Sequence, residues 1–180
     1  PRAKIIVTGC IVENDALALA QIRGVDFVIS KKFFPAGISN FCGHTRAFLK
    51  IQDGCNNFCS YCKVPLVRGR SRSRDLGEII SEAQQLVKNG FQEIVLCGIC
   101  LGAYGKDLQS QRSLVDVIEE LERIEGLLRI RLSSIEAGDI LDELINKMAQ
   151  SLPGPRLPVG QGQAGNKLCR HLHIPIQSGD

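Results

Sequence analysis

Aromatic residues are scarce in this sequence, which contains no tryptophan and only two tyrosines among its 180 residues. Few side chains are therefore available to stack on bases, as they do in many proteins that bind single-stranded nucleic acid. The sequence also lacks a run of roughly eighteen apolar residues, the length that a membrane-spanning helix needs, and no apolar signal segment precedes its cysteines. These absences predict a cytoplasmic protein that does not associate with a membrane.

Charge and cysteine content narrow the class of protein further. The formal net charge of +3 is too small to indicate nucleic-acid binding by itself. Eight cysteines are many for this length but too few for a disulfide scaffold, so we expect thiols that bind a metal or fill the core in a reducing compartment. The apolar fraction of 44% is ordinary for a globular core, and the length suits one domain, or one domain and part of another.

Three of the cysteines, Cys55, Cys59 and Cys62, form a CxxxCxxC motif. Three thiolates this close in sequence can bind one iron–sulfur cluster and leave its fourth iron without a protein ligand. An open iron can bind a substrate, whereas a fully ligated cluster mainly carries electrons. The spacing differs from the CxxCxxCxxxC run of two-cluster ferredoxins and from the paired CxxC of structural zinc sites. The motif therefore predicts an iron–sulfur site with an open iron.

Four arginines directly follow the cysteine motif at every second position: Arg68, Arg70, Arg72 and Arg74. In an extended segment this spacing would place all four guanidinium groups on one face. A row of fixed cations suits phosphate groups, so the pattern favours a nucleic-acid contact. A charged loop in contact with solvent only is the alternative.

Apolar runs typical of buried strands alternate along the chain with segments of helical spacing. Asp75 with Glu78 and Ser113 with Asp116 each form a capping pattern that starts a helix. Such repeats with short loops indicate right-handed βαβ units and a parallel sheet. The predicted strands are residues 4–8, 26–29, 47–51, 93–97, 128–133 and 170–176, and the predicted helices are 13–22, 139–150 and those that start at 75 and 113 and end before Gly90 and Gly126.

The stretch from Thr45 to Arg74, TRAFLKIQDGCNNFCSYCKVPLVRGRSRSR, resembles the core signature of the radical S-adenosylmethionine (SAM) methylthiotransferases. It is most similar to those that act on threonylcarbamoyladenosine in tRNA, and the resemblance continues through 96–108, 131–140 and 170–180. The resemblance implies that SAM binds the open iron. An electron from the cluster would then cleave SAM to a 5′-deoxyadenosyl radical. The implied reaction adds a methylthio group to C2 of N6-threonylcarbamoyladenosine next to the anticodon.

The resemblance also implies a domain organisation. The fold would be α/β, a partial (β/α)6 radical-SAM barrel with its first four strands present and its active site at the C-terminal strand ends. Residues 1–30 would end an N-terminal α/β methylthiotransferase domain, 31–45 would be a linker, and 46–180 the radical SAM core. The core would be incomplete at its C-terminus and carry a Pro/Gly-rich insertion at 151–167. We expect such an internal fragment to be inactive alone.

Site residues follow from the same resemblance. Cys55, Cys59 and Cys62 would bind one 4Fe–4S cluster. Cys10 matches one ligand of a second 4Fe–4S cluster, whose other two ligands would lie before Pro1. The implied contacts to SAM are Tyr61, Gly98, Ser134 and Glu136, and those to substrate RNA are Arg68, Arg70, Arg72, Arg74 and His173.

Simpler roles stay open for several of these side chains. Tyr61 could pack within its loop, Glu136 could cap the next helix, and His173 could be packed and hydrogen-bonded inside the barrel. Cys97 and Cys100 form a CxxC, but Cys97 ends an apolar strand instead of opening a helix. Packing is therefore favoured over redox chemistry for this pair.

The implied partners are tRNA and an electron donor such as flavodoxin or ferredoxin. One alternative keeps the mechanism and changes the substrate to a ribosomal-protein aspartate. The arginine row favours tRNA over it, because a protein substrate does not require a track for phosphates. Another alternative is a non-catalytic module that binds an iron–sulfur cluster or zinc.

Overall fold

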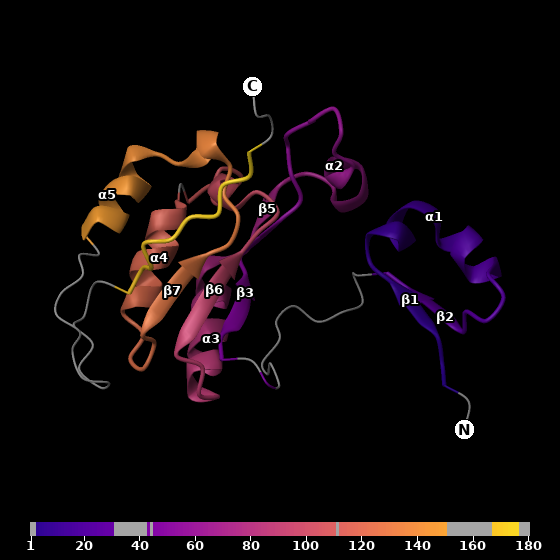
Figure 1. The fold of residues 1–180 in the computed structure, drawn as a ribbon, viewed down its shortest axis with the longest axis horizontal. Helices are drawn as coiled ribbons and strands as arrows, with labels where there is room; N and C mark the ends of the chain where they lie inside the picture. Colours follow the sequence, from indigo (N-terminus) through magenta and orange to yellow (C-terminus); the bar gives the residue numbers. More distant parts are fainter. Residues whose placement is uncertain (1–2, 31–42, 44, 111, 151–166, 177–180) are drawn as a thin grey trace. The chain divides into compact units, whose positions relative to one another are not determined.

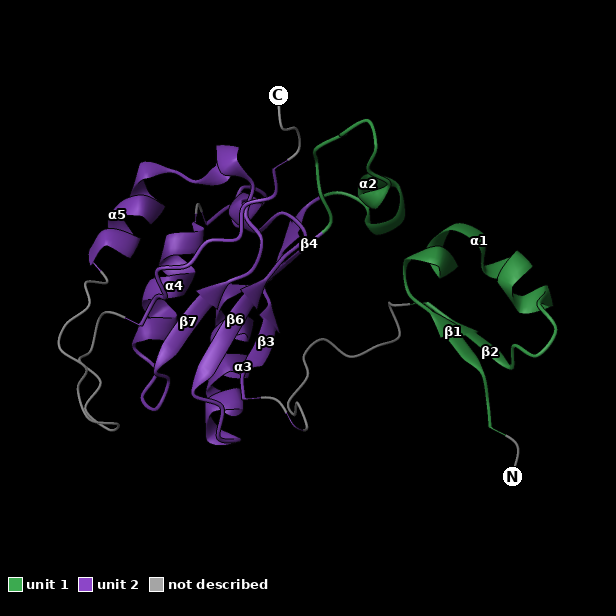
Figure 2. Ribbon diagram, viewed as in Figure 1, with its two compact units in different colours: residues 1–36, 54–70 green, residues 37–53, 71–180 purple. Residues whose placement is uncertain are grey.

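The structure is a computed structural model that describes residues 3–30, 43, 45–110, 112–150 and 167–176. The chain divides into two compact units (Figure 2). Unit 1 consists of residues 1–36 and 54–70, and unit 2 of residues 37–53 and 71–180. Most of the predicted linker at 31–45 and of the insertion at 151–167 lies outside the described residues. Within the described part of the chain, no helix is both long and apolar enough to cross a membrane.

A parallel sheet forms the centre of unit 2 (Figure 1). Strand β6 (Glu93–Cys97) lies between β3 (Ala47–Lys50) and β7 (Arg129–Leu132). Leu49 is opposite Leu96, which in turn is opposite Leu132, so these three side chains share one face of the sheet. All three are buried. The predicted α/β fold with a parallel sheet is confirmed.

Unit 2 also contains three helices, α3 (Leu76–Lys88), α4 (Leu114–Glu122) and α5 (Asp142–Gln150), which contribute side chains to the same core as the sheet. Both predicted N-terminal caps are present, since Asp75 accepts from the N–H groups of Gly77 and Glu78, and Ser113 forms a capping box with Asp116. Burial of each large apolar side chain contributes about 1.5–3 kcal/mol. The core includes Leu49, Ile79, Leu86, Leu96, Ile118, Leu121, Ile130, Leu132 and Leu144.

The opposite face of the sheet is charged where the strands begin. Glu93 is close to three arginines, with 3.1 Å to Arg131, 3.4 Å to Arg129 and 3.8 Å to Arg46. The Glu93 side chain is 14% exposed, so this carboxylate is compensated by its cationic neighbours. The network fixes the starts of β6 and β7 to each other.

The predicted strand at 170–176 is wrong. Residues 167–176 make only isolated parallel bridges, in which Leu168 pairs with Ile130 and His173 with Ser134. The N–H of His171 donates to the carbonyl of Cys169 at 2.8 Å, and this tight turn interrupts the extended backbone between the two bridges. The segment nevertheless runs beside β7 in the parallel direction.

Other element boundaries differ from the prediction by a few residues. Helix α4 ends at Glu122, whereas the prediction extended it up to Gly126, and a 3-10 turn, η3 (Ala137–Asp139), precedes α5 where one continuous helix was predicted. A second 3-10 turn, η2 (Leu101–Ala103), follows β6. The short strands β4 (Gln52–Asp53) and β5 (Arg72–Ser73), which pair antiparallel, were not predicted.

Unit 1 contains the βαβ piece that the sequence predicts. Strand β1 (Ile6–Thr8) is parallel to β2 (Phe27–Ile29), and α1 (Cys10–Gln21) connects them. Helix α1 starts three residues earlier than predicted and is interrupted at Asp15, whose φ of −149° is not helical. The same unit includes the cysteine motif and α2 (Val64–Arg68), which contacts α1.

Candidate functional site

The cysteine motif lies in residues 54–70, which we call the cysteine loop. In the chain it follows β4 and precedes β5. The N–H of Cys55 donates to the carbonyl of Gly69 at 3.1 Å, and the N–H of Cys62 to that of Cys59 at 3.0 Å. The first bond closes the loop at its base, and the second forms a turn between two of the predicted ligands.

The chemistry of the three thiols fits an iron–sulfur cluster. None of them forms a disulfide; Cys55 and Cys62 are half-buried and Cys59 is exposed. The N–H of Asn57 donates to Cys55 Sγ at 3.3 Å, a contact that stabilises a thiolate. Across the described residues, no three His, Cys, Asp or Glu side chains converge as a metal site. Three thiols are the donors that an iron–sulfur cluster takes, but they do not converge in this conformation, so cluster binding would have to draw them together.

Gly54 permits the close approach at the base of the cysteine loop. Its φ of +72° lies in the region that favours glycine, and a β-carbon here would overlap the carbonyl oxygen of Arg70. Gly54 is buried. The residue directly before the first predicted ligand therefore has a conformation and a space that only glycine fits.

The predicted arrangement of the four arginines on one extended face is wrong. Arg68 is the last residue of helix α2, Gly69 has a φ of +78°, and Arg72 lies in strand β5. The change from helix to turn to strand removes the two-residue repeat on which the shared face depended. Arg70 and Arg72 are exposed, and Arg68 is half-buried.

The guanidinium of Arg74 is paired with other groups of unit 2 and is not available to a phosphate. Its guanidinium donates to Glu82 at 2.7 Å and to the carbonyl of Lys50 at 2.8 Å. The Arg74 side chain is 18% exposed, and its backbone N–H donates to the carbonyl of Ile51 at 2.9 Å. Arg74 therefore connects α3 to the end of β3.

The loop after β6 contains Gly98, the predicted SAM contact. Its neighbour in unit 2 is Gln52, a fully buried side chain that the sequence analysis did not single out. Gln52 accepts from the N–H of Cys100 at 2.9 Å. The position of Gln52 in the sequence could have identified it, because it is a polar residue between the predicted strand at 47–51 and the cysteine motif.

Cys97 and Cys100 behave as packed side chains, in line with the favoured interpretation. Cys100 is 6% exposed, and its Sγ is 3.4 Å from a carboxylate oxygen of Asp139. Burial raises the pKa of the Cys97 thiol. A raised pKa does not suit a reactive thiol.

Ser134 and His173 are brought together where β7 ends. Ser134 Oγ is 2.9 Å from His173 Nδ1, and the N–H of Ile135 donates to the carbonyl of His173. Both Ser134 and His173 are exposed. Glu136 follows as the half-buried residue that precedes η3. Three predicted site residues thus lie within one short region of unit 2.

A second set of contacts fixes the loop after η2 to β5. Tyr104 is 3% exposed and donates its hydroxyl to the carbonyl of Arg74 at 2.9 Å. The pKa of Tyr104 is raised to about 12. Burial is the largest cause, and the negative charges of Asp75 and Asp107 act in the same direction. Burial also acts to raise the pKa of Asp107, but the hydrogen bonds that it accepts from Ser73 outweigh this and lower the pKa.

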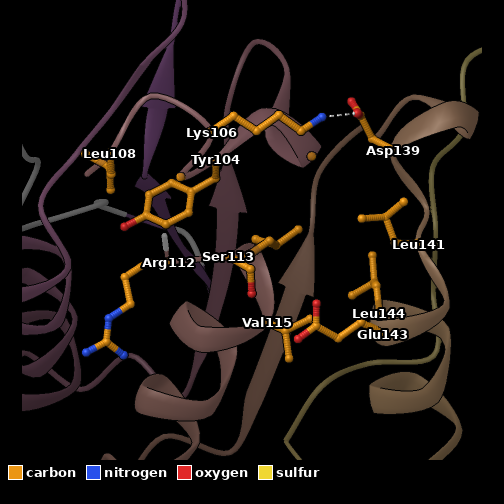
Figure 3. A pocket seen from close by; sticks show the side chains of 13 residues that line it. Tyr104, Lys106, Leu108, Arg112, Ser113, Val115, Asp139, Leu141, Glu143 and Leu144 are labelled. Atoms are coloured by element: carbon orange, nitrogen blue, oxygen red, sulfur yellow. Dashed lines mark hydrogen bonds and ion pairs between the residues drawn. The ribbon is translucent and has the colours of Figure 1, made fainter. Parts of the chain in front are cut away.

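A cavity of about 300 Å³ lies between the loop after η2, the start of α4 and the start of α5 (Figure 3). Leu141 and Leu144 line one side of it, and Tyr104 the other. Lys106 and Asp139 form an ion pair of 2.9 Å at its rim. No sequence pattern predicted this cavity, and none of the predicted site residues lines it.

Comparison with known proteins gives matches along the whole chain. The sequence profile of the radical SAM superfamily matches residues 49–180. A Bacillus subtilis protein named threonylcarbamoyladenosine tRNA methylthiotransferase is 39% identical over 99% of this chain and 43% of its own length. A Chlamydia pneumoniae protein of the same name is 36% identical over 100% of this chain and 46% of its own length.

A third relative carries a different name. This Dehalococcoides mccartyi protein, a tRNA-2-methylthio-N(6)-dimethylallyladenosine synthase, is 38% identical over 100% of the chain and 42% of its own length. The chain therefore spans less than half the length of the curated relatives that it matches.

Proposed function

Because the chain belongs to the radical SAM superfamily, we propose that it is part of a tRNA methylthiotransferase that acts on N6-threonylcarbamoyladenosine. The observation that carries this proposal is the similarity to two enzymes of that name over essentially the whole chain. The superfamily uses a 4Fe–4S cluster and SAM. The product would be the adenosine with a methylthio group at C2.

We assign the cluster to the cysteine loop. The thiolates of Cys55, Cys59 and Cys62 would bind three irons and leave the fourth to SAM. When bound, the cluster and SAM supply the electron and the carbon radical that removes hydrogen from the substrate. The N–H of Asn57, 3.3 Å from Cys55 Sγ, would stabilise the negative charge on that ligand. Cys10, half-buried at the start of α1, would contribute to a second cluster.

We assign the SAM contacts to the ends of β6 and β7 and to the cysteine loop. Gly98 has no β-carbon, so its backbone can approach the amino group of SAM closely. Glu136 can accept from a ribose hydroxyl, with Ser134 beside it. Tyr61 is 66% exposed and could lie against the adenine. Parallel α/β folds place their active sites at these strand ends.

The substrate contacts would come from the arginines that are exposed or half-exposed and from His173. Arg70 and Arg72 are exposed, and Arg68 is the third candidate for a phosphate contact. Arg74 is not included, because it is paired with Glu82. The contact of Ser134 with Nδ1 fixes the ring of His173, so a substrate contact would be made through Nε2.

The closest alternative is methylthiolation of N6-dimethylallyladenosine. The observation in its favour is the Dehalococcoides mccartyi relative, which matches the whole chain with an identity similar to that of the Bacillus subtilis protein. A ribosomal-protein aspartate as substrate has no such support among the relatives reported above. With a tRNA substrate, we further propose a cytoplasmic location and reduction by a flavodoxin or ferredoxin.

The test is mass spectrometry of tRNA nucleosides from cells that lack their own methylthiotransferases. These cells would express the full polypeptide that the gene encodes. A methylthio group on N6-threonylcarbamoyladenosine supports the proposal. A methylthio group on N6-dimethylallyladenosine supports the alternative substrate. No methylthio group on either nucleoside, from a protein that contains iron and sulfide, contradicts both.

A further inference from the structure

Gln52 makes hydrogen bonds within its own segment of unit 2 and to two other segments, those of Ser71 and Cys100. Its Nε2 donates to the carbonyl of Asp53 at 3.0 Å and to Ser71 Oγ at 2.9 Å. Its Oε1 accepts from the N–H of Cys100 at 2.9 Å. Asp53 and Ser71 flank the cysteine loop in the chain, and Cys100 belongs to the loop after β6. One side chain therefore connects both flanks of the cysteine loop to the candidate SAM-binding segment.

The orientation of this amide is fixed by its partners. A backbone N–H can only donate, so Oε1 has to face Cys100. A backbone carbonyl can only accept, so Nε2 has to face Asp53. The reverse orientation would place two donors together and two acceptors together. Gln52 therefore has one arrangement in which its hydrogen bonds form.

Gly98 is packed directly against this amide. A β-carbon on Gly98 would lie 3.0 Å from Oε1 of Gln52 and 3.2 Å from the α-carbon of Leu101. The N–H of Ile51 donates to the carbonyl of Cys97 at 2.9 Å, which ends the regular ladder between the two chain segments. Gln52 continues that connection with its side chain where the backbone ladder stops.

A residue needed only for packing at this position would not have to be polar. Gln52 is fully buried, and a buried amide is tolerated only when its hydrogen bonds are made. An apolar side chain could fill the same space but could not hold the N–H of Cys100. The effect that requires a glutamine at position 52 is therefore that its amide fixes the backbone from Gly98 to Cys100.

We propose that Gln52 is a positioning residue that holds the loop after β6 in the conformation that binds SAM. It does so relative to Asp53 and Ser71, the residues that flank the cysteine loop in the chain. This inference rests on the proposed function, since it requires SAM to contact Gly98. Gln52 itself need not touch SAM.

The test compares Gln52→Met with Glu122→Gln in the anaerobically reconstituted protein. Methionine has similar length and no hydrogen-bond donors. Glu122 is the matched control, because it is also a buried polar residue of unit 2, 5% exposed, and it accepts from the N–H of Lys167 at 3.2 Å. Both variants should lower the unfolding midpoint. Only Gln52→Met should weaken SAM binding, by about tenfold, while its iron content stays that of the unchanged protein.

Amide hydrogen exchange gives a readout that does not depend on the cluster. The N–H of Cys100 should exchange about tenfold faster in Gln52→Met than in the unchanged protein, because its acceptor is removed. In Glu122→Gln, exchange of the Cys100 N–H should change only as far as the global stability of the protein changes.

Gln52→Glu provides a conservative rescue with a pH signature. The protonated carboxyl keeps an acceptor for Cys100 and regains one donor, whereas the buried carboxylate has no donor. Burial raises the pKa of such a carboxyl, so SAM affinity of this variant should recover as pH falls from about 8.5 to 6.5. The unchanged protein should show no such recovery.

The outcomes separate the two proposals. If the unchanged protein binds SAM and Gln52→Met binds it equally well, the role of Gln52 is refuted and the proposed function stands. If the unchanged protein assembles no SAM-responsive cluster, both are refuted. Equal losses of SAM affinity in Gln52→Met and Glu122→Gln would show a general effect of destabilisation and would overturn the inference.

Discussion

Gly54 lies against the backbone of Arg70, so that a β-carbon at position 54 would overlap the Arg70 carbonyl oxygen. The hydrogen bond from Cys55 to Gly69 closes the same point of the chain. The cysteine loop therefore has a fixed base, although one of its three thiols is exposed and the other two are half-buried. The thiols of such a loop can move to bind a cluster while the base of the loop stays closed.

Replacement of this glycine should prevent cluster assembly. In Gly54→Ala the overlap with Arg70 forces the two ends of the loop apart, and the positive φ adds roughly 1–3 kcal/mol of strain. We expect the iron and sulfide content after reconstitution to fall to a small fraction of that of the unchanged protein.

The matched control for this prediction is Gly69→Ala. Gly69 also has a positive φ, +78°, but no atom lies within 4 Å of the place where a β-carbon would stand. This variant should carry the backbone strain alone and keep most of its iron. Equal iron contents in the two variants would show that the contact with Arg70 does not matter.

Loss of a thiol should abolish the cluster without unfolding the protein. In Cys59→Ala only two thiolates of the motif remain, too few to hold the cluster, whereas the exposed Cys59 side chain contributes little to packing. Iron analysis should show no cluster, and far-UV circular dichroism should show unchanged helix content. Cys97→Ala, a change in a cysteine outside the motif, should retain the cluster. A full cluster in Cys59→Ala would refute the ligand assignment.

The arginines should separate into those that bind RNA and one that stabilises the fold. Charge reversal at Arg70 and Arg72 should weaken tRNA binding and reduce its salt dependence, by about 0.7–0.9 in log–log slope for each phosphate that is no longer neutralised. Arg74→Gln should instead lower stability by about 1.5–3 kcal/mol, because Glu82 loses its partner. Filter binding across a salt series and denaturant unfolding measure the two effects. An unchanged salt slope in the Arg70 and Arg72 variants would argue against the phosphate contacts.

Tyr104 predicts a loss of stability at high pH. Its pKa is raised to about 12, so the neutral hydroxyl is favoured in the folded state more than in the unfolded chain, where the value is about 10. The stabilisation is therefore complete below pH 10 and is lost as the pH rises toward 12. Tyr104→Phe should remove this component and lower stability at neutral pH by about 1 kcal/mol. Unfolding midpoints of the metal-free protein across pH 9–12 should show the difference; parallel curves would contradict it.

The elements that could be predicted from the sequence are those set by local chemistry. Apolar runs predict the three parallel strands, and Asp75 and Ser113 predict the starts of α3 and α4, because a buried strand and a helix cap are each encoded within a few residues. The CxxxCxxC motif is likewise local. These features need no knowledge of the rest of the fold.

Features that depend on distant residues could not be predicted in the same way. Spacing alone suggests a shared face for the four arginines, but α2 and the pairing of β5 with β4 separate them. The ion pair of Arg74 with Glu82 is equally invisible in the spacing. Gln52 lies within the signature at Thr45–Arg74, but no local pattern shows its role, since its partner Cys100 is forty-eight residues further along the chain.

EPR spectroscopy of the protein, after anaerobic reconstitution with iron and sulfide and reduction with dithionite, tests whether the cysteine loop binds a cluster with an open iron. Spectra would be recorded with and without SAM. We expect a reduced 4Fe–4S signal that shifts when SAM is added, because Cys55, Cys59 and Cys62 leave one iron to SAM. A cluster signal that does not respond to SAM, or a protein that binds zinc and no sulfide, would contradict it.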